Sequence, residues 1–218
     1  MALTLRADVL DYEQVEEAVN GMRRDGGEID VLICAAGIQG AIGPVWETPP
    51  SSWARTIETN LIGVLHACRA VLPHMVKRRC GKIIALAGPG AMRSRPNFSA
   101  YAAAKAAVVR MVETIADEAR EHNVQANCLG PGPTYTHMTD EILRAGELAG
   151  WKEHEDAVKI RLTGGAPPDK QMELAAFLAS EESNHISGKL LHIEDNWKRL
   201  RRGNVHSELY TLRRVRKV

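Results

Sequence analysis

The feature that most constrains the fold is an alternation of apolar, β-branched runs with longer amphipathic segments. Each run ends near a glycine, and the segments between the runs have the apolar spacing of helices. Strands with this composition are buried on both faces, and strands joined through helices pair in parallel. The sequence therefore predicts an α/β fold of βαβ units. The apolar runs are residues 29–35, 83–87, 124–129 and 188–193.

Helices are expected between these runs. Asp11 is suited to cap a helix that runs to about Arg24, and Ser51 or Ser52 to cap a long helix that runs to about Arg79. A helix near Tyr101 and another over residues 168–180 follow the later strands. Residues 38–50 are expected to be loop. Residues 134–168 form a polar, partly helical excursion that we expect to cover the substrate.

Composition limits the function classes. The 218 residues have 44% hydrophobic content, which fits one domain, residues 1–218, with a basic tail over residues 198–218. The 28 basic and 27 acidic side chains nearly balance, so no overall field recruits nucleic acid or an anionic membrane. No apolar run approaches the roughly 20 residues of a membrane helix. Four cysteines without CxxC spacing and an N-terminus without an apolar signal core favour a soluble protein with reduced thiols in the cytoplasm.

The histidines and the tail suggest no further ligand. Eight histidines show no HxxxH spacing, so no metal site is predicted. The tail has Glu208 as its only acid and Tyr210 as its only aromatic residue. Because aromatic side chains for base stacking are nearly lacking, we favour a solvated or interface-packing tail over a nucleic-acid arm.

The best candidate for chemistry is the pair Tyr101 and Lys105. Residues four apart lie on one face of a helix, and a fixed ammonium beside a phenol favours the phenolate. Lys105 would then make Tyr101 a usable acid or base near neutral pH. The alternative is a surface helix that carries a Tyr and a Lys. Ligands of parallel α/β sheets bind beyond the carboxyl ends of the strands, and the Tyr101 helix is expected to begin on that side.

Several motifs resemble the short-chain dehydrogenase/reductase family, in its order and at about its spacing. Tyr101 to Lys105 matches the YxxxK motif, and Asn60 falls where the family keeps an Asn within a helix. The turn after the first apolar run resembles the family's NNAG motif, with Cys34 in place of the first Asn. That turn is Cys34-Ala35-Ala36-Gly37. The remaining matches are Asp8-Val9, and Asn127 followed by Pro131-Gly132 and Thr136.

The resemblance implies a role for each of these residues. Tyr101 would be the general acid/base, Lys105 would hold the nicotinamide ribose and lower the Tyr101 pKa, and Asn60 would seat a water that relays protons to Lys105. Thr136 would fix the carboxamide of NAD or NADP, and Asp8-Val9 would contact adenine. The other cofactor contacts would be Ala35, Ala36, Gly37, Pro131 and Gly132.

Some of these residues also have a purely structural interpretation. Asn60 can be a solvent-facing helix residue, Pro131-Gly132 a turn that ends a strand, and Thr136 the cap of the following helix. The resemblance further implies a homo-oligomer, dimer or tetramer, because the helices near Ser51 and Ser99 correspond to the family's dimer seam.

The sequence departs from the family in two respects. It contains no TGxxxGxG turn, and the two strands and helices with which the family begins are not found, so the expected fold is a Rossmann-like doubly wound sheet without them. The family's carbonyl-polarising Ser lies thirteen residues before the Tyr, where this chain has Gly88. Ser94 is a weak candidate to replace it, whereas Ser99 is expected to cap the Tyr101 helix.

The missing strands suggest a rearranged sheet edge. Residues 2–6 alternate as a short strand, and an exposed apolar edge favours aggregation. We therefore predict that residues 2–6 occupy the vacated position and pair in parallel with residues 30–34.

Together these observations predict an oxidoreductase that transfers a hydride between NAD(P) and a small alcohol or carbonyl substrate, with impaired turnover. One alternative is a non-catalytic remnant that oligomerises or binds a partner. The other is that Met1 is internal to a longer enzyme.

Overall fold

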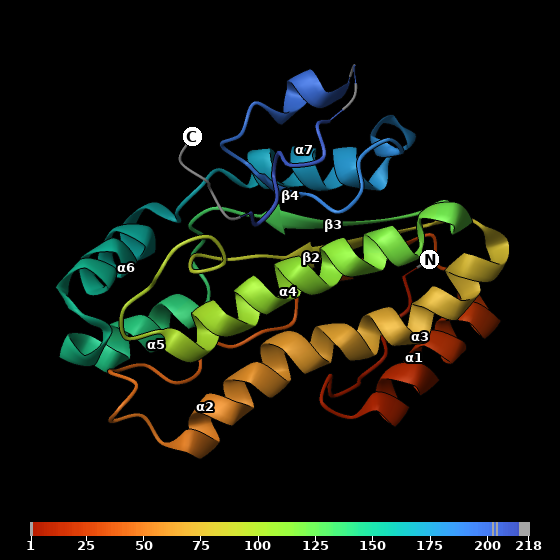
Figure 1. The fold of residues 1–218 in the computed structure, drawn as a ribbon. Helices are drawn as coiled ribbons and strands as arrows, with labels where there is room; N and C mark the ends of the chain where they lie inside the picture. The colour runs from red at the N-terminus through yellow and green to blue at the C-terminus, as the bar shows by residue number, and fades with distance from the viewer. Residues whose placement is uncertain (1, 202, 204, 214–218) are drawn as a thin grey trace.

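The structure is a computed structural model that describes residues 2–201, 203 and 205–213. In this part of the chain, a parallel sheet of four strands has the order β1 to β4, so chain order and sheet order coincide (Figure 1). Each strand falls within, or within two residues of, one of the predicted apolar runs. The strands are β1 (Val31–Cys34), β2 (Gly81–Leu86), β3 (Val124–Gly130) and β4 (Leu190–His192).

Helices cover both faces of the sheet, which confirms the doubly wound α/β prediction. One face carries α1 (Tyr12–Gly26), α3 (Gly63–Arg78) and α4 (Ser99–Glu118), and the other carries α7 (Pro168–Ala179). Neighbouring residues of a strand point to opposite faces, so Ile83 packs into the first layer and Ile84 into the second.

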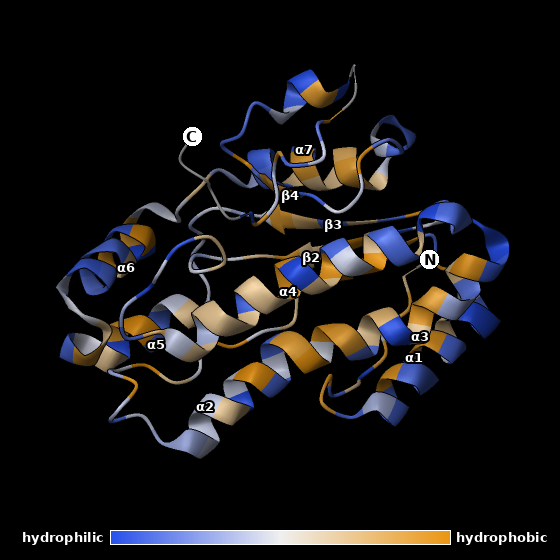
Figure 2. Cartoon of the chain, in the orientation of Figure 1, coloured by the Kyte–Doolittle hydropathy of each residue, from blue (hydrophilic) through white to orange (hydrophobic). Residues whose placement is uncertain are grey.

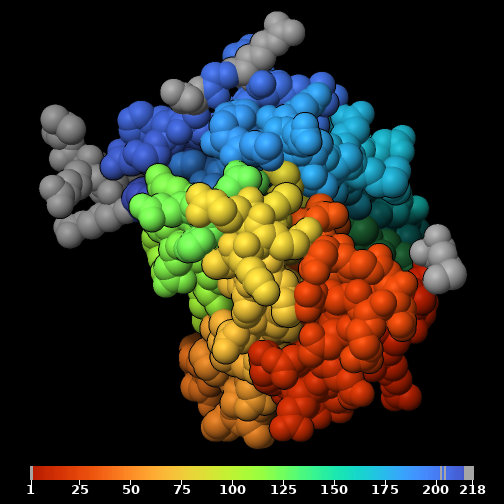
Figure 3. All heavy atoms as spheres, turned by 90° about the vertical axis from the view of Figure 1, so that its right-hand side faces the viewer, coloured from red at the N-terminus to blue at the C-terminus, as the bar shows by residue number. Residues whose placement is uncertain are grey.

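Hydropathy follows this layering. Hydrophobic residues concentrate in α3, α4 and the sheet, whereas α1, α2 (Pro50–Ile57) and α6 (Trp151–Thr163) carry more hydrophilic residues (Figure 2). Figure 3 shows the end of the molecule where the strands begin. At this end, Arg78 at the end of α3 binds the segment before β1. It donates to Asp30 Oδ1 at 2.9 Å and to the Ile29 carbonyl at 2.8 Å.

The prediction for residues 2–6 is wrong. The segment is not a strand and lies along α1, where Leu5 and Leu3 pack over Gly21 and Gly26. Both leucines remain exposed there, at 38% for Leu3 and 47% for Leu5. Since the segment does not join the sheet, β1 is an edge strand, and it is not buried on both faces as predicted, because Ile33 is 50% exposed.

The helix starts also differ from the prediction. Pro49 occupies the N-cap position of α2, so neither Ser51 nor Ser52 caps it, and Phe98 occupies that position at α4 in place of Ser99. Proline suits a helix start because its fixed φ is helical and the first N–H groups lack partners in any case. The Ser99 hydroxyl instead accepts a hydrogen bond from Trp53 Nε1 at 3.1 Å.

The predicted long helix contains an interruption. A π-helical turn, η1 (Glu58–Ile62), joins α2 to α3 and includes Asn60. Such turns insert a residue into the helical ladder and are frequent at functional sites.

The excursion after β3 is helical for much of its length. It contains α5 (His137–Ala145), the 3₁₀ turn η3 (Gly146–Ala149) and α6, which lie beyond the carboxyl ends of the strands (Figure 1). Three further 3₁₀ turns complete the chain: η2 (Arg120–His122), η4 (Glu181–Ser183) and η5 (Trp197–Arg201).

The described part of the C-terminal tail packs against the domain. Lys189 Nζ donates to the carbonyls of His206, Ser207 and Leu209 at 2.7–3.1 Å, and the Leu190 N–H donates to the Tyr210 carbonyl. This agrees with a packing tail. Arg202, Arg214, Arg216 and Lys217 lie outside the described residues.

Candidate active site

Tyr101 and Lys105 lie on α4 beside the carboxyl end of β2. Lys105 Nζ donates to the Leu86 carbonyl at 2.8 Å, and the Tyr101 ring lies against Gly88, two residues beyond that strand. Both side chains are buried, with 5% of each residue exposed. The sheet thus places the phenol and the ammonium at the edge where ligands of such folds bind.

Burial controls the ionisation of this pair. It raises the pKa of Tyr101 above its usual value, a shift that the Arg95 guanidinium opposes, and it lowers the pKa of Lys105 to about 8. The expectation that Lys105 lowers the Tyr101 pKa is therefore wrong for this structure. The Lys105 ammonium binds Leu86, and its Nζ lies 5.7 Å from the Tyr101 ring centroid, so desolvation of the phenol dominates.

Asn60 joins the site through the turn after β1. Its Oδ1 accepts from the Ile38 N–H at 3.0 Å, and its Nδ2 donates to the Ile38 carbonyl at 2.9 Å. Gly37 lies so close that a Cβ there would be 2.7 Å from Asn60 Oδ1, which explains the glycine. Asn60 is fully buried, so the interpretation as a solvent-facing residue is wrong. Its helix packs against α4, so the amide, the phenol and the ammonium lie on one side of the molecule.

The other end of the predicted cofactor site is a cavity of about 680 Å³ that brings Asp8, Val9 and Ala36 together. Val9 is fixed because its side chain lies over Gly63 and its carbonyl contacts His66 Nδ1 at 2.8 Å. Ala36 and its neighbour Ala35 are exposed at the end of β1. Residues 8 and 36, distant in sequence, are thus adjacent in the fold.

The segment after β3 is held by its own structural contacts. Pro131 and Thr134 both accept hydrogen bonds from Gln171 of α7, and Gly132 packs against Ile193 with a positive φ of 70°. Thr136 is exposed at the N-cap of α5, as the capping interpretation expects. Asn127 is buried and binds Ile186 and Lys189, so it fixes the start of β4.

Helices α5 and α6 cover Tyr101. Phe98, Tyr101, Ile142, Ala149 and Ala157 form one buried apolar cluster, so the excursion packs over the candidate acid/base. Trp151 is 79% exposed and takes no part in this cover.

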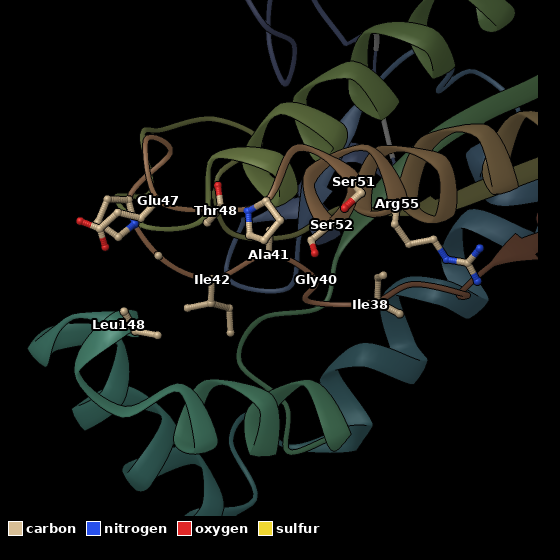
Figure 4. Close-up of a pocket in the computed structure, with 13 residues that line it drawn as sticks. Ile38, Gly40, Ala41, Ile42, Glu47, Thr48, Ser51, Ser52, Arg55 and Leu148 are labelled. Atoms are coloured by element: carbon tan, nitrogen blue, oxygen red, sulfur yellow. The ribbon is translucent and has the colours of Figure 1, made fainter.

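Beside this cluster, a cavity of about 760 Å³ opens between residues 38–49, the start of α2 and Leu148 (Figure 4). Ile42 lines the cavity and also packs against the cluster.

Arg95 is a residue near Tyr101 that no sequence motif indicates. This residue lies in the loop after β2, with its guanidinium 3.9 Å from the Phe98 ring centroid and 5.3 Å from the Tyr101 ring centroid. Its Nε and Nη2 donate to the Glu153 carboxylate of α6 at 3.0 and 2.8 Å. A single Arg in a polar loop carries no periodic signal, so only the fold reveals its position.

Comparison with known proteins places this geometry in context. A family model described as Enoyl-(Acyl carrier protein) reductase matches residues 1–195. A 2-dehydro-3-deoxy-L-rhamnonate dehydrogenase (NAD(+)) of Sphingomonas sp. is 37% identical over 80% of this chain and 68% of its own length. A 3-oxoacyl-[acyl-carrier-protein] reductase of Thermotoga maritima is 31% identical over 86% and 73%. The chain belongs to the short-chain dehydrogenase/reductase family.

A solved structure of the same fold supports this assignment. A gluconate 5-dehydrogenase from Burkholderia cenocepacia, in complex with NADP and tartrate, superposes with a TM-score of 0.74 at 29% identity. The match covers 85% of this chain and 71% of that one.

The structure shows what Gly88 does. A Cβ at this position would overlap the Tyr101 hydroxyl oxygen and lie 3.1 Å from Tyr101 Cζ. The phenol therefore fills the space beside the backbone where a side chain would project. Ser94 is exposed on the loop and makes no hydrogen bond to Tyr101, so it does not replace a donor at position 88.

Two further findings concern the described residues alone. No helix there is both long and apolar enough to cross a bilayer. No group of three His, Cys, Asp or Glu side chains there is arranged to hold a metal ion.

Proposed function

We propose that this chain is an NAD(P)-dependent oxidoreductase that acts on a hydroxyl or carbonyl carbon of a small molecule. The observation that supports it most is the juxtaposition of Tyr101 and Lys105 at the carboxyl end of β2, within a fold of this family. The similar proteins are named as dehydrogenases and reductases, and their names include NAD(+) and NADP.

In this proposal Tyr101 transfers the proton. Its hydroxyl donates to the carbonyl oxygen during reduction and accepts the alcohol proton during oxidation. Because burial raises the Tyr101 pKa, the phenol stays protonated at neutral pH, which favours proton donation. Lys105 is proposed to hold the nicotinamide ribose, and Asn60 to fix the turn after β1 and seat the relay water.

The residues fit a dinucleotide at its two ends. Asp8, Val9 and Ala36 border one cavity that suits the adenosine end, and Ala35 is exposed beside it. Gly37, Pro131, Gly132 and Thr136 are proposed to line the nicotinamide end, at the ends of β1 and β3. When bound, the cofactor supplies or accepts the hydride.

We further propose weak turnover. Loss of one donor to a developing oxyanion costs on the order of 10²- to 10³-fold in rate, and Gly88 has no such donor. This feature favours the second candidate function, a non-catalytic protein of this family that oligomerises or binds a partner. A homo-oligomer and a cytoplasmic location also stay predictions.

The test is a fluorescence titration with NADH and NADPH, followed by steady-state rates with small alcohols and ketones. We expect cofactor binding and a slow rate that Tyr101→Phe lowers at least about 10²-fold without loss of cofactor binding. Tyr210→Phe is the matched control, because Tyr210 packs against the apolar cluster on the α7 face of the sheet and not against the Tyr101 cluster. Cofactor binding without turnover in the natural chain would support the non-catalytic candidate.

A further inference from the structure

Arg95 is a charged side chain buried beneath α6. Only 6% of the side chain is exposed, and the Nε–Nη2 edge binds the Glu153 carboxylate in a bidentate pair. An arginine stays charged at all relevant pH values, so its burial requires compensation from its surroundings. Glu153 compensates one edge of the guanidinium.

The other edge is not compensated. Arg95 Nη1 is buried and has no hydrogen-bond partner among the residues that the structure describes. Buried donors of native proteins are nearly always paired, and an exception requires an explanation such as a missing ligand. The unpaired nitrogen therefore indicates an absent acceptor.

The position of this edge connects it to the candidate active site. The guanidinium packs over Phe98, a residue with no exposed surface, and lies beside the Tyr101 ring. Its orientation is thus fixed by the aromatic ring on one side and by Glu153 on another. The Arg95 guanidinium carbon lies 5.3 Å from the Tyr101 ring centroid, so the charge is a neighbour of the candidate acid/base.

A second unpaired donor lies on the opposite loop. Gln39 is 2% exposed, its Nε2 has no partner among the described residues, and its backbone N–H donates to Glu141 of α5 at 3.1 Å. The loop of Gln39 and the loop of Arg95 both contribute to the surroundings of Tyr101, through Ile42 and Phe98. Two buried donors without acceptors suit a ligand rich in oxygen atoms and oppose an apolar one.

From these observations we propose that Arg95 binds a carboxylate of the substrate, which is a small hydroxy acid or oxo acid; this inference rests on the proposed function. The planar guanidinium matches the geometry of a carboxylate, and charge-assisted hydrogen bonds in a buried site are the strong ones.

The experiment compares acids with uncharged alcohols of the same carbon chain. The pairs are D-gluconate with D-glucitol and L-tartrate with L-threitol, and binding is measured by calorimetry with the full chain. We expect each acid to bind at least about tenfold more tightly than its alcohol, and Arg95→Gln to weaken acid binding by about 10- to 100-fold. Alcohol binding changes little in the same variant.

Glu153→Gln separates this role from a merely structural one. If Arg95 only anchors α6, both variants weaken acids and alcohols alike. Under the proposal, Glu153→Gln keeps the preference for acids, because the Arg95 charge remains. Arg95→Lys serves if Arg95→Gln does not fold; it retains the charge without the planar fork and should lose part of the preference.

Two results would overturn the inference: no preference for acids in the natural chain, or an unchanged preference in both Arg95 variants. Neither depends on turnover. Acid binding that needs Arg95, without any NAD(P)-linked oxidation or reduction, would contradict the proposed function and support the inference. Turnover of alcohols without a preference for acids would support the proposed function and contradict the inference.

Discussion

A side chain at position 88 would have to share its space with the Tyr101 hydroxyl, so these two residues are coupled. Gly88→Ala should lower the free energy of unfolding by about 1–3 kcal/mol through overpacking. In a Tyr101→Phe background the loss should be smaller, because the overlapping oxygen is gone and Cζ and Cε1, 3.1 and 3.2 Å away, remain. Urea denaturation of the four proteins gives the coupling energy. Additive losses would show that the phenol does not occupy this space.

Lys105 links the site to pH-dependent stability. Its pKa in the folded chain is about 8, below its ordinary value of 10.5. The unfolded chain binds this proton more readily between these values, so the Lys105 contribution to the unfolding free energy rises as pH increases from 8 to 10.5. Below pH 8 the buried ammonium destabilises the fold by about 3 kcal/mol.

Lys105→Met removes this contribution. The stability of the variant relative to the natural chain should be greatest near pH 7 and decline towards pH 10, as measured by urea denaturation at both pH values. Lys159→Met, at an exposed position of α6, is the control. A pH-independent difference would contradict the burial of a charged amine.

At the scale of elements, the junction between η1 and the turn after β1 depends on one amide. Asn60→Ala leaves the Ile38 N–H and carbonyl without partners, so the free energy of unfolding should fall by about 2–4 kcal/mol. Glu58→Ala, at an exposed position of the same π-helical turn, should change it by less than about 0.5 kcal/mol. Equal losses in the two variants, measured by urea denaturation, would show that the amide does not hold the turn.

Across the whole molecule, the C-terminal segment is attached to the sheet by Lys189. Its ammonium donates to three carbonyls of residues 206–209, which Lys189→Met leaves without this donor. Amide hydrogen exchange of residues 205–211 should become at least about tenfold faster. Lys170→Met, which removes an exposed ion pair with Glu194, should leave that exchange unchanged. Unaltered exchange in Lys189→Met would show that other contacts hold the segment.

The sequence by itself determined the α/β class, the strands and the positions of Tyr101, Lys105 and Asn60 along the chain. Apolar periodicity and glycine-rich turns are local signals, and a motif fixes spacing without regard to what packs around it. The starts of the helices were harder to predict, because Pro49 and Phe98 compete with nearby serines that are equally plausible caps.

Only the tertiary structure decided which segments pack together and which side chains are buried. Residues 2–6 have the pattern of a strand, yet they lie along α1, where Leu3 and Leu5 stay exposed over Gly26 and Gly21. The raised pKa of Tyr101 and the unpaired Nη1 of Arg95 depend on burial beneath α5 and α6. Burial and charge neighbours are long-range quantities, because they are set by segments that are distant in sequence, and no local pattern encodes them.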